Sequence, residues 1–268
     1  MVHTNVPSAT IGIIGGTGVY DPKLFKDVSE HKIYTPYGET SDLIQTGELG
    51  GRRVAFIPRH GRNHRIPPHA INYRANIWAL RELGVKAILA PAAVGSLQER
   101  YAPGELVFVD QFIDRTRGRR DTFYDGGPVC HVSTADPVCP DLHRLLGERA
   151  KALGLPFHPD GVYVCIQGPR FSTRAESNLF RSWGASVVGM TMYPECVLAR
   201  EAQICYATIA MVTDYDCWMT GRVVDNQEVI RTMKANVDKV RKLLADVIPK
   251  ISEKRPCACG RALEGALI

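Results

Sequence analysis

Six apolar, strand-like runs in this chain each end abruptly in a short cluster of glycine, hydroxyl or charged residues. The runs cover residues 11–14, 54–57, 87–90, 162–166, 186–189 and 207–212. In open α/β sheets, ligands bind outside the carboxyl ends of the strands. The pattern therefore predicts that these six strand ends assemble one site for an anionic, polar ligand.

Strand-like and helix-like periodicities alternate along most of the chain. Strands are expected at 10–14, 32–35, 42–46, 53–57, 86–90, 106–112, 161–166, 186–190 and 205–212. Helices are expected at 71–83, 141–153, 173–183, 194–202 and from Asn226 to about residue 251. This alternation is typical of an α/β fold with a central, largely parallel or mixed sheet flanked by helices on both faces.

No linker, repeat or low-complexity stretch divides the chain, so residues 1–268 are expected to form a single domain. Residues 253–268 form a cysteine-containing C-terminal tail. The apolar fraction of 45% and the charged fraction of 23% are ordinary for a globular protein. No apolar run approaches membrane-spanning length, and the first residues do not resemble a secretion signal. A cytoplasmic protein is therefore expected.

The formal charge of +5 fits anionic small substrates. Residues 115–120 form a dense basic run, Arg-Thr-Arg-Gly-Arg-Arg, which raises the question of nucleic-acid binding. The run has no interleaved aromatic residues and no recognisable motif around it. A solvated loop or a subunit contact is the preferred interpretation.

Eight cysteines are many for an intracellular chain of this length. Cys257-Ala258-Cys259 suggests a strained local disulfide or a redox pair, and a zinc site is disfavoured because no second Cys/His pair stands nearby in the sequence. A bridge between Cys139 and Cys205 would close a longer loop and is the better candidate for thermal stability. Intracellular disulfides are rare outside hyperthermophiles, and the Arg-rich, Pro-rich composition is a weak sign of such a source.

The glycine cluster at residues 15–18 could let backbone N–H groups approach an anion, with Thr17 adding a hydroxyl. It lacks the third glycine of a dinucleotide fingerprint and the Gly-Lys of a P-loop, so a plain tight turn remains open. Arg59-His60 favours phosphate, because a guanidinium matches two phosphate oxygens at once. The alternative for Arg59 is an ordinary surface salt bridge.

Asp214-Tyr215-Asp216 at a strand end is the most chemically specific element. Two carboxylates in an apolar site cannot both ionise cheaply, so one pKa should rise. A protonated Asp214 could then donate to N7 of adenine while its partner accepts from the 6-amino group. The alternative is a helix-capping or surface pair of aspartates.

The segments at 12–18, 59–62, 72–80, 110–116, 168–177 and 213–218 occur together and in order. With this set the chain resembles the purine nucleoside phosphorylase family, specifically its 5′-methylthioadenosine phosphorylase branch. The resemblance implies phosphorolysis of 5′-methylthioadenosine to adenine and 5-methylthioribose 1-phosphate. Inorganic phosphate is then a co-substrate, and no metal or organic cofactor is required.

The resemblance also implies roles for individual residues. Phosphate would be held by Thr17, Arg59, His60, Ala92, Ala93 and Thr191. Ribose and base would contact Met190, Phe171, Ser172, Asp214, Tyr215 and Asp216, with Asp214 as the catalytic acid. The 5′ group would contact Ser172, Asn226, Val229, Ile230 and, from a neighbouring subunit, His131. A site shared in this way implies a homotrimer or a dimer of trimers.

Two positions qualify this picture. Ala92 replaces a hydroxyl residue common in the family, which should weaken phosphate binding. Asn226 makes the 5′ pocket more polar than an alkylthio group requires, so adenosine itself is an expected substrate. Two other classes were compared: a phosphorylase for 6-oxopurines, which an amide at position 214 would favour, and a dinucleotide-binding protein, which only the glycine cluster suggests.

Overall fold

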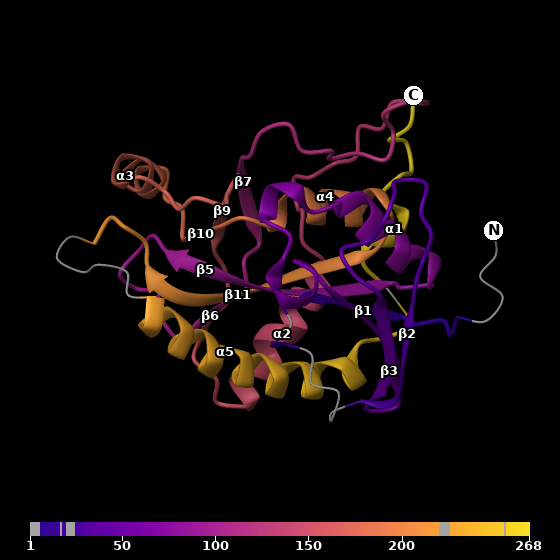
Figure 1. The fold of residues 1–268 in the computed structure, drawn as a ribbon, viewed down its shortest axis with the longest axis horizontal. Helices are drawn as coiled ribbons and strands as arrows, with labels where there is room; N and C mark the ends of the chain where they lie inside the picture. The colour runs from indigo at the N-terminus through magenta and orange to yellow at the C-terminus, as the bar shows by residue number, and fades with distance from the viewer. Residues whose placement is uncertain (1–5, 17, 20–24, 220–225, 255) are drawn as a thin grey trace.

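The computed structural model describes residues 6–16, 18–19, 25–219, 226–254 and 256–268, with the side chains of 226–230 excepted. Within these residues the fold is a single α/β domain built on one mixed sheet of eleven strands (Figure 1). The strands are β1 (Ile11–Gly15), β2 (Lys26–His31), β3 (Ile44–Leu49), β4 (Arg52–Pro58), β5 (Ala87–Ser96), β6 (Leu106–Val107), β7 (Gln111–Arg115), β8 (Phe157–His158), β9 (Val162–Ile166), β10 (Val187–Gly189) and β11 (Cys205–Tyr215).

Strand β5 is the centre of the sheet. The main order is β2-β3-β4-β1-β5-β10-β9-β7, while β11 pairs with β5 and β6, and β6 also pairs with β8. Strands β4, β1, β5 and β11 run parallel to one another in this centre, whereas β10 runs antiparallel to β5. Every residue of β1 is buried, as expected for a parallel strand covered on both faces.

Helices cover both faces of the sheet, as the alternation predicts. α1 (Tyr73–Glu82) and α4 (Met192–Glu201) lie together on one face, and α2 (Pro140–Ala152) and α5 (Asn226–Val247) lie on the other (Figure 1). α3 (Arg174–Ser182) projects at one end of the molecule. Short 3₁₀ turns are η2 (Arg62–His64), η3 (Pro68–Ala70), η4 (Ile248–Lys250) and η5 (Ala258–Arg261).

Two predicted strands are wrong in their placement. The strand expected at 32–35 is instead β2, an edge strand whose exposed polar side chains give no apolar signal. The strand expected at 106–112 is two strands: β6 pairs with β11 and β8, whereas β7 pairs with β9. Phe108 and Val109, buried between them, extend the apolar run across this change of partner.

β5 and β11 extend beyond their predicted ends, and both extensions hold candidate site residues. β5 continues through Pro91 to Ser96, and β11 continues to Tyr215 past a register shift between Val212 and Asp214. Residues expected in loops are therefore fixed by strand pairing, which restricts their backbone motion.

The C-terminal tail packs on the body of the domain. The backbone of His131 donates to Ala266, and Val129 and Ile268 exchange hydrogen bonds. Cys259, in the same tail, is buried. None of the helices in the described part of the chain has the length and apolar character needed to span a membrane.

Candidate active site

A cavity of about 710 Å³ opens where the six predicted strand ends meet. From the strands and the segments after them come Gly16, Gly18, Arg59, His60, Pro91, Ala92, Ala93, Val94, Gly95, Ile166, Phe171, Ser172, Val188, Gly189, Met190, Thr191, Met211, Thr213, Asp214 and Asp216. From η2, η3 and α5 come His64, Pro68, Met233, Lys234, Val237, Asp238 and Arg241. The sequence prediction of one site assembled from six segments therefore agrees with the fold.

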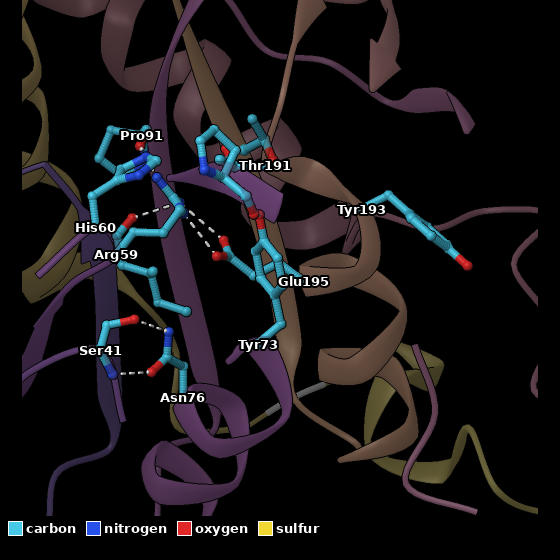
Figure 2. Close-up of polar contacts among 12 residues, drawn as sticks. Ser41, Arg59, His60, Tyr73, Asn76, Pro91, Thr191, Tyr193 and Glu195 are labelled. Carbon is cyan, nitrogen blue, oxygen red and sulfur yellow. Dashed lines mark hydrogen bonds and ion pairs between the residues drawn. The ribbon is translucent and has the colours of Figure 1, made fainter. Parts of the chain in front are cut away.

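Arg59 follows β4 and is buried, with 2% of its surface exposed. Its guanidinium donates through Nε and Nη2 to both oxygens of Glu195 on α4, at 2.8 and 2.9 Å (Figure 2). It also donates to the carbonyls of Pro91 and Ile14. Burial opposes the charge of Arg59, but the pairing with Glu195 outweighs burial and raises the arginine pKa further.

These contacts change the expected role of Arg59. Protein acceptors take four of the five guanidinium N–H groups, and one on Nη1 remains for a ligand. The sequence alternatives were a phosphate clamp and a surface salt bridge. The structure shows a salt bridge that is buried rather than on the surface. A bidentate interaction of Arg59 with phosphate would require breaking this salt bridge.

His60 lies beside Arg59 and is held in one tautomer. Its Nδ1 lies 2.9 Å from the carbonyl oxygen of Ile66, which only accepts, so Nδ1 carries hydrogen. Burial, with the positive charges of Arg59 and His64 nearby, lowers the pKa of His60 to about 4. At neutral pH the ring is therefore uncharged and Nε2 carries a lone pair, which suits a hydrogen bond from a protonated phosphate oxygen.

Thr191 and Met190 follow β10 at the cavity wall. The Thr191 hydroxyl makes no capping hydrogen bond to α4, and its backbone N–H donates to the hydroxyl of Tyr163. Gly189 has no room for a side chain, because a Cβ there would lie 2.0 Å from that same hydroxyl. The tight packing of Tyr163 against Gly189 fixes the start of this segment.

Asp214 and Asp216 both face the cavity from the end of β11. Burial raises the pKa of each, and the neighbouring Asp216 charge raises that of Asp214 further. Thr213 donates to Asp214 Oδ2 at 2.7 Å. Gly95 makes room for the pair, since a Cβ on it would lie 3.3 Å from Asp214 Oδ1 and from Asp216 Cβ. Burial together with a neighbouring carboxylate favours the protonated form of an acid of this kind.

Most candidate residues lie together, and some do not. The cavity brings together Arg59, His60, Ala92, Ala93, Phe171, Ser172, Met190, Thr191, Asp214 and Asp216. Tyr215 is not among the lining residues, because strand alternation turns it away from Asp214, and its hydroxyl donates to Glu99. His131 is exposed near the C-terminal tail. Thr17 and the side chains of Asn226, Val229 and Ile230 lie outside the described residues.

Sequence reasoning missed Glu195 and Thr213. Glu195 is an acidic residue in the apolar first turn of α4, and its burial next to a buried arginine was not visible from spacing. Thr213 was included in the strand-end segment but given no role, and the register shift before Asp214 lets both residues line the cavity.

The basic run is partly structural. Arg119 donates to the carbonyls of Tyr193 and Gln167 and contacts the Tyr73 hydroxyl. The interpretation as a solvated loop is therefore wrong for Arg119, whose guanidinium joins three segments of the domain, while a subunit contact by this run stays a prediction.

Residues 10–249 match the family model described as the phosphorylase superfamily. The chain is 57% identical over 258 residues to the S-methyl-5′-thioadenosine phosphorylase of Thermofilum pendens, covering 96% of this chain and 98% of the relative. It is 54% identical over 272 residues to the Saccharolobus solfataricus enzyme of the same name, covering 100% of both.

Solved structures give the same result. A methylthioadenosine phosphorylase from an antarctic soil metagenomic library is 44% identical with a TM-score of 0.94, covering 98% of this chain and 93% of that one. Methylthioadenosine phosphorylase from Schistosoma mansoni in complex with adenine is 37% identical with a TM-score of 0.91, covering 97% and 99%. The chain therefore belongs to the phosphorylase superfamily, within its S-methyl-5′-thioadenosine phosphorylase family.

Proposed function

We propose that this enzyme, a pentosyltransferase, catalyses phosphorolysis of S-methyl-5′-thioadenosine to adenine and 5-methylthioribose 1-phosphate, a reaction of purine and methionine salvage. The observation that supports it best is the buried Asp214–Asp216 pair in the same cavity as His60 and Thr191. The first pair suits a 6-aminopurine, and the second suits an anion. Inorganic phosphate is the co-substrate, and the proposed chemistry needs no metal or organic cofactor.

Base recognition follows from the raised pKa of Asp214. A neutral carboxyl can donate to N7 of adenine, and an oxygen of the pair can accept from the 6-amino group. A 6-oxopurine would present an oxygen to that acceptor and leave it unpaired, which costs affinity. Phe171 and Ser172 flank the cavity at the same end of β9 and are proposed to contact the base.

Phosphate is proposed to contact His60, Thr191, the remaining Arg59 N–H, the Ala92–Ala93 segment and Thr17. Neutral His60 favours HPO₄²⁻, whose one hydroxyl can donate to Nε2. Ala92 offers only its backbone for hydrogen bonding, so a raised KM for phosphate remains part of the proposal.

The chemistry follows from charge. Breaking the glycosidic bond develops positive charge on the sugar and negative charge on the purine. The phosphate dianion faces the sugar, and the Asp214 proton stabilises N7 as the base leaves. Both interactions strengthen in the transition state, which is where binding accelerates a reaction. No covalent enzyme intermediate is required.

The 5′-methylthio group is proposed to lie against apolar lining of the cavity. Met190, Met211, Met233, Val188 and Val237 contribute apolar surface, and sulfur-containing and apolar side chains pack well against a thioether. Asn226, Val229, Ile230 and a neighbouring subunit's counterpart of His131 complete the proposed pocket. Adenosine is a proposed second substrate, and a similar Schistosoma mansoni protein is named adenosine/methylthioadenosine phosphorylase.

A homotrimer or dimer of trimers is the proposed assembly. Phe171, Leu179 and Trp183 are large apolar side chains exposed in and beside α3, and such a group marks a surface for another copy of the chain. The cytoplasm is the proposed location, because the proposed reaction belongs to purine and methionine salvage.

The test is a comparison of kcat/KM for methylthioadenosine, adenosine and inosine at saturating phosphate. The account predicts methylthioadenosine first, adenosine measurable and inosine at least about 100-fold lower, as for an unpaired buried acceptor. Equal or higher efficiency on inosine would instead support the 6-oxopurine phosphorylase.

A further inference from the structure

Helix α3 carries one small polar side chain on the face that it turns toward the domain. Ser177 and Phe180 are the buried residues of this helix, and Ser177 has no exposed surface. Phe180 packs in one apolar cluster with Trp218, and the guanidinium carbon of Arg181 lies 3.6 Å from the centre of the Trp218 ring. Side chains at this spacing share one face of a helix. The inward face of α3 therefore packs against the segment that follows β11.

The Ser177 hydroxyl lies beside the carboxyl of Asp216. Its oxygen is buried, and within the described part of the chain no hydrogen bond of normal geometry reaches it. The Asp216 carboxyl and the Cys217 thiol are its polar neighbours. Leaving a buried hydroxyl without a partner is unfavourable, and a carboxylate is a far better acceptor than a thiol. Asp216 is therefore the acceptor that suits this hydroxyl.

We propose that Ser177 is a positioning residue for base recognition, whose hydroxyl donates to the Asp216 carboxylate and keeps this carboxylate the acceptor for the 6-amino group of the purine. The inference rests on the proposed function and refines it, because it explains why the two aspartates take different tasks. Asp214 then holds the proton that N7 receives. Ser177 acts through Asp216, because it is not among the described residues that line the cavity.

The donors around Asp216 favour its ionised form. Burial raises the pKa of this carboxyl, and three groups act in the opposite direction. The hydroxyl of Ser177 has the largest lowering effect, followed by the backbone N–H of Cys217 and the hydroxyl of Ser172. Hydrogen bonds to a carboxylate stabilise its charge, so losing the largest of them should make Asp216 easier to protonate.

Asp214 has fewer such donors. Among the described residues the hydroxyl of Thr213 reaches it, at 2.7 Å from Oδ2. The same hydroxyl lies 3.2 Å from the carbonyl oxygen of Val94 and has one proton to share between the two. The charge of Asp216 raises the pKa of Asp214 further. One proton on the pair is therefore directed to Asp214.

The start of α3 and the end of β11 are tied together, which fixes the hydroxyl against the carboxyl. Arg174 Nε donates to the carbonyl of Cys217 at 3.3 Å, and Cys217 Sγ donates to the carbonyl of Ser172 at 3.2 Å. The backbone N–H of Asp216 donates to Ser96 of β5 at 3.1 Å. Groups held in this way lose little freedom when they bond, which suits a positioning role.

The other charged groups facing Asp216 keep one charge state between pH 4 and pH 8. Burial raises the pKa of the Cys217 thiol, so it stays neutral. Hydrogen bonds from a neighbouring arginine hold the pKa of Glu176 at about 2, so it stays ionised. Arg174 keeps its positive charge. A change in base recognition over this pH range therefore reports on Asp216 and its partner Asp214.

The test is the substitution Ser177→Ala. Alanine suits a helix, so the fold should be kept. The kcat/KM for methylthioadenosine at saturating phosphate should fall about tenfold, the scale of one hydrogen bond to a charged group. The acid limb of its pH profile should move up by about one pH unit, because Asp216 protonates more easily. The preference for adenosine over inosine should narrow, because a protonated Asp216 can donate to the 6-oxygen.

Ser182→Ala is the matched control on the same helix. Ser182 is exposed and its hydroxyl donates to Leu179 within α3, so its removal should change none of these values. Ser177→Cys keeps a side chain of similar size with a weaker donor, and it should lie between wild type and Ser177→Ala in both the acid limb and the preference. This second variant gives the same test if the alanine variant does not fold.

A wild-type acid limb and a wild-type preference in the Ser177 variants would overturn the proposal. So would an equal loss of efficiency on adenosine and inosine with an unmoved acid limb, which is the result of a merely structural role. Wild-type protein alone tests the proposed function, through adenine release that depends on phosphate. A failure of that function is thereby distinguished from a failure of this inference, which appears only when the variants are compared.

Discussion

Burial decides what the single charged side chains of the site can do. Asp214 is pushed toward its neutral form, His60 is kept neutral by a pKa of about 4, and Arg59 keeps its charge through Glu195. The cavity therefore presents a carboxyl that is shifted toward its protonated form and a histidine lone pair, and the first of these agrees with the raised aspartate pKa that the sequence predicts. Both features fit a reaction between a purine and a hydrogen phosphate.

Asp214→Asn tests the proton donor. An amide cannot transfer a proton to N7, so kcat/KM for methylthioadenosine should fall by roughly 10²-fold or more, and preference should shift toward 6-oxo nucleosides. Steady-state kinetics on both nucleoside classes measures this. Asp160→Asn, an exposed aspartate elsewhere, is the control and should change neither value. Unchanged efficiency in Asp214→Asn would remove the catalytic role.

The same substitution should change how stability depends on pH. Burial raises the pKa of Asp214 in the folded state above its ordinary value of 3.8. The contribution of this carboxyl to the free energy of unfolding is therefore fully present below pH 3.8 and is lost as the pH rises through the folded pKa. The amide has no such transition. Urea unfolding between pH 4 and pH 8 should therefore show a smaller loss of unfolding free energy in the variant. Parallel curves for variant and wild type would contradict the raised pKa.

At the scale of elements, the pair Arg59–Glu195 joins β4 to α4 across the cavity wall. The same guanidinium reaches carbonyls of β1 and β5, so one side chain connects four elements. Glu195 in turn accepts from Tyr206 of β11. The cavity wall is thus set by a buried polar network as well as by strand pairing.

Arg59→Ala is expected to weaken both the fold and phosphate binding. It leaves the Glu195 carboxylate buried without its partner, at a cost of about 3–5 kcal/mol in the free energy of unfolding. Arg59→Met/Glu195→Gln removes both charges and should recover most of that loss. Chemical denaturation compares the two variants, and equal stability of Arg59→Ala and wild type would contradict the buried pair.

The double variant also isolates the role of Arg59 toward phosphate. In Arg59→Met/Glu195→Gln, the KM for phosphate should rise steeply, whereas the affinity for nucleoside in the absence of phosphate should change little. Calorimetry that found equal phosphate affinity in the variant and wild type would remove Arg59 from the phosphate site and leave it as a support of the wall.

The element pattern was readable from the sequence where elements are long and buried. Helix α2 and strand β9 were expected within one residue of their observed bounds. β2 was not, because an edge strand with polar side chains has no apolar alternation. Asp214 and His60 could be named from residue type and strand-end position. The partner Glu195 could not, because residues 59 and 195 meet only through the fold.

At the scale of the molecule, the C-terminal tail is held to the body away from the catalytic cavity. The sequence paired Cys139 with Cys205 and Cys257 with Cys259, and the sulfurs of each pair do lie within 4.8 Å of one another. That the two pairs meet was not predicted, because Cys139 and Cys257 are far apart in the chain. Attaching the C-terminal tail to the body of the domain should stabilise the folded state without taking part in the reaction.

Cys257→Ser/Cys259→Ser should keep full activity at moderate temperature and lose half-life on heating. Releasing the tail removes contacts from the folded state, whereas the cavity keeps all its lining residues. Residual activity after heating, with and without reductant, measures the effect. Heat inactivation at the wild-type rate in both conditions would leave the two cysteines without a structural role.

The most direct test of the central claim is adenine release from methylthioadenosine with and without inorganic phosphate. The account predicts adenine and 5-methylthioribose 1-phosphate in equal amounts when phosphate is present, and no release above background when it is absent. Release at the same rate without phosphate, with free 5-methylthioribose as the sugar product, would show a hydrolase. No release in either condition would contradict the assignment of the cavity to this nucleoside.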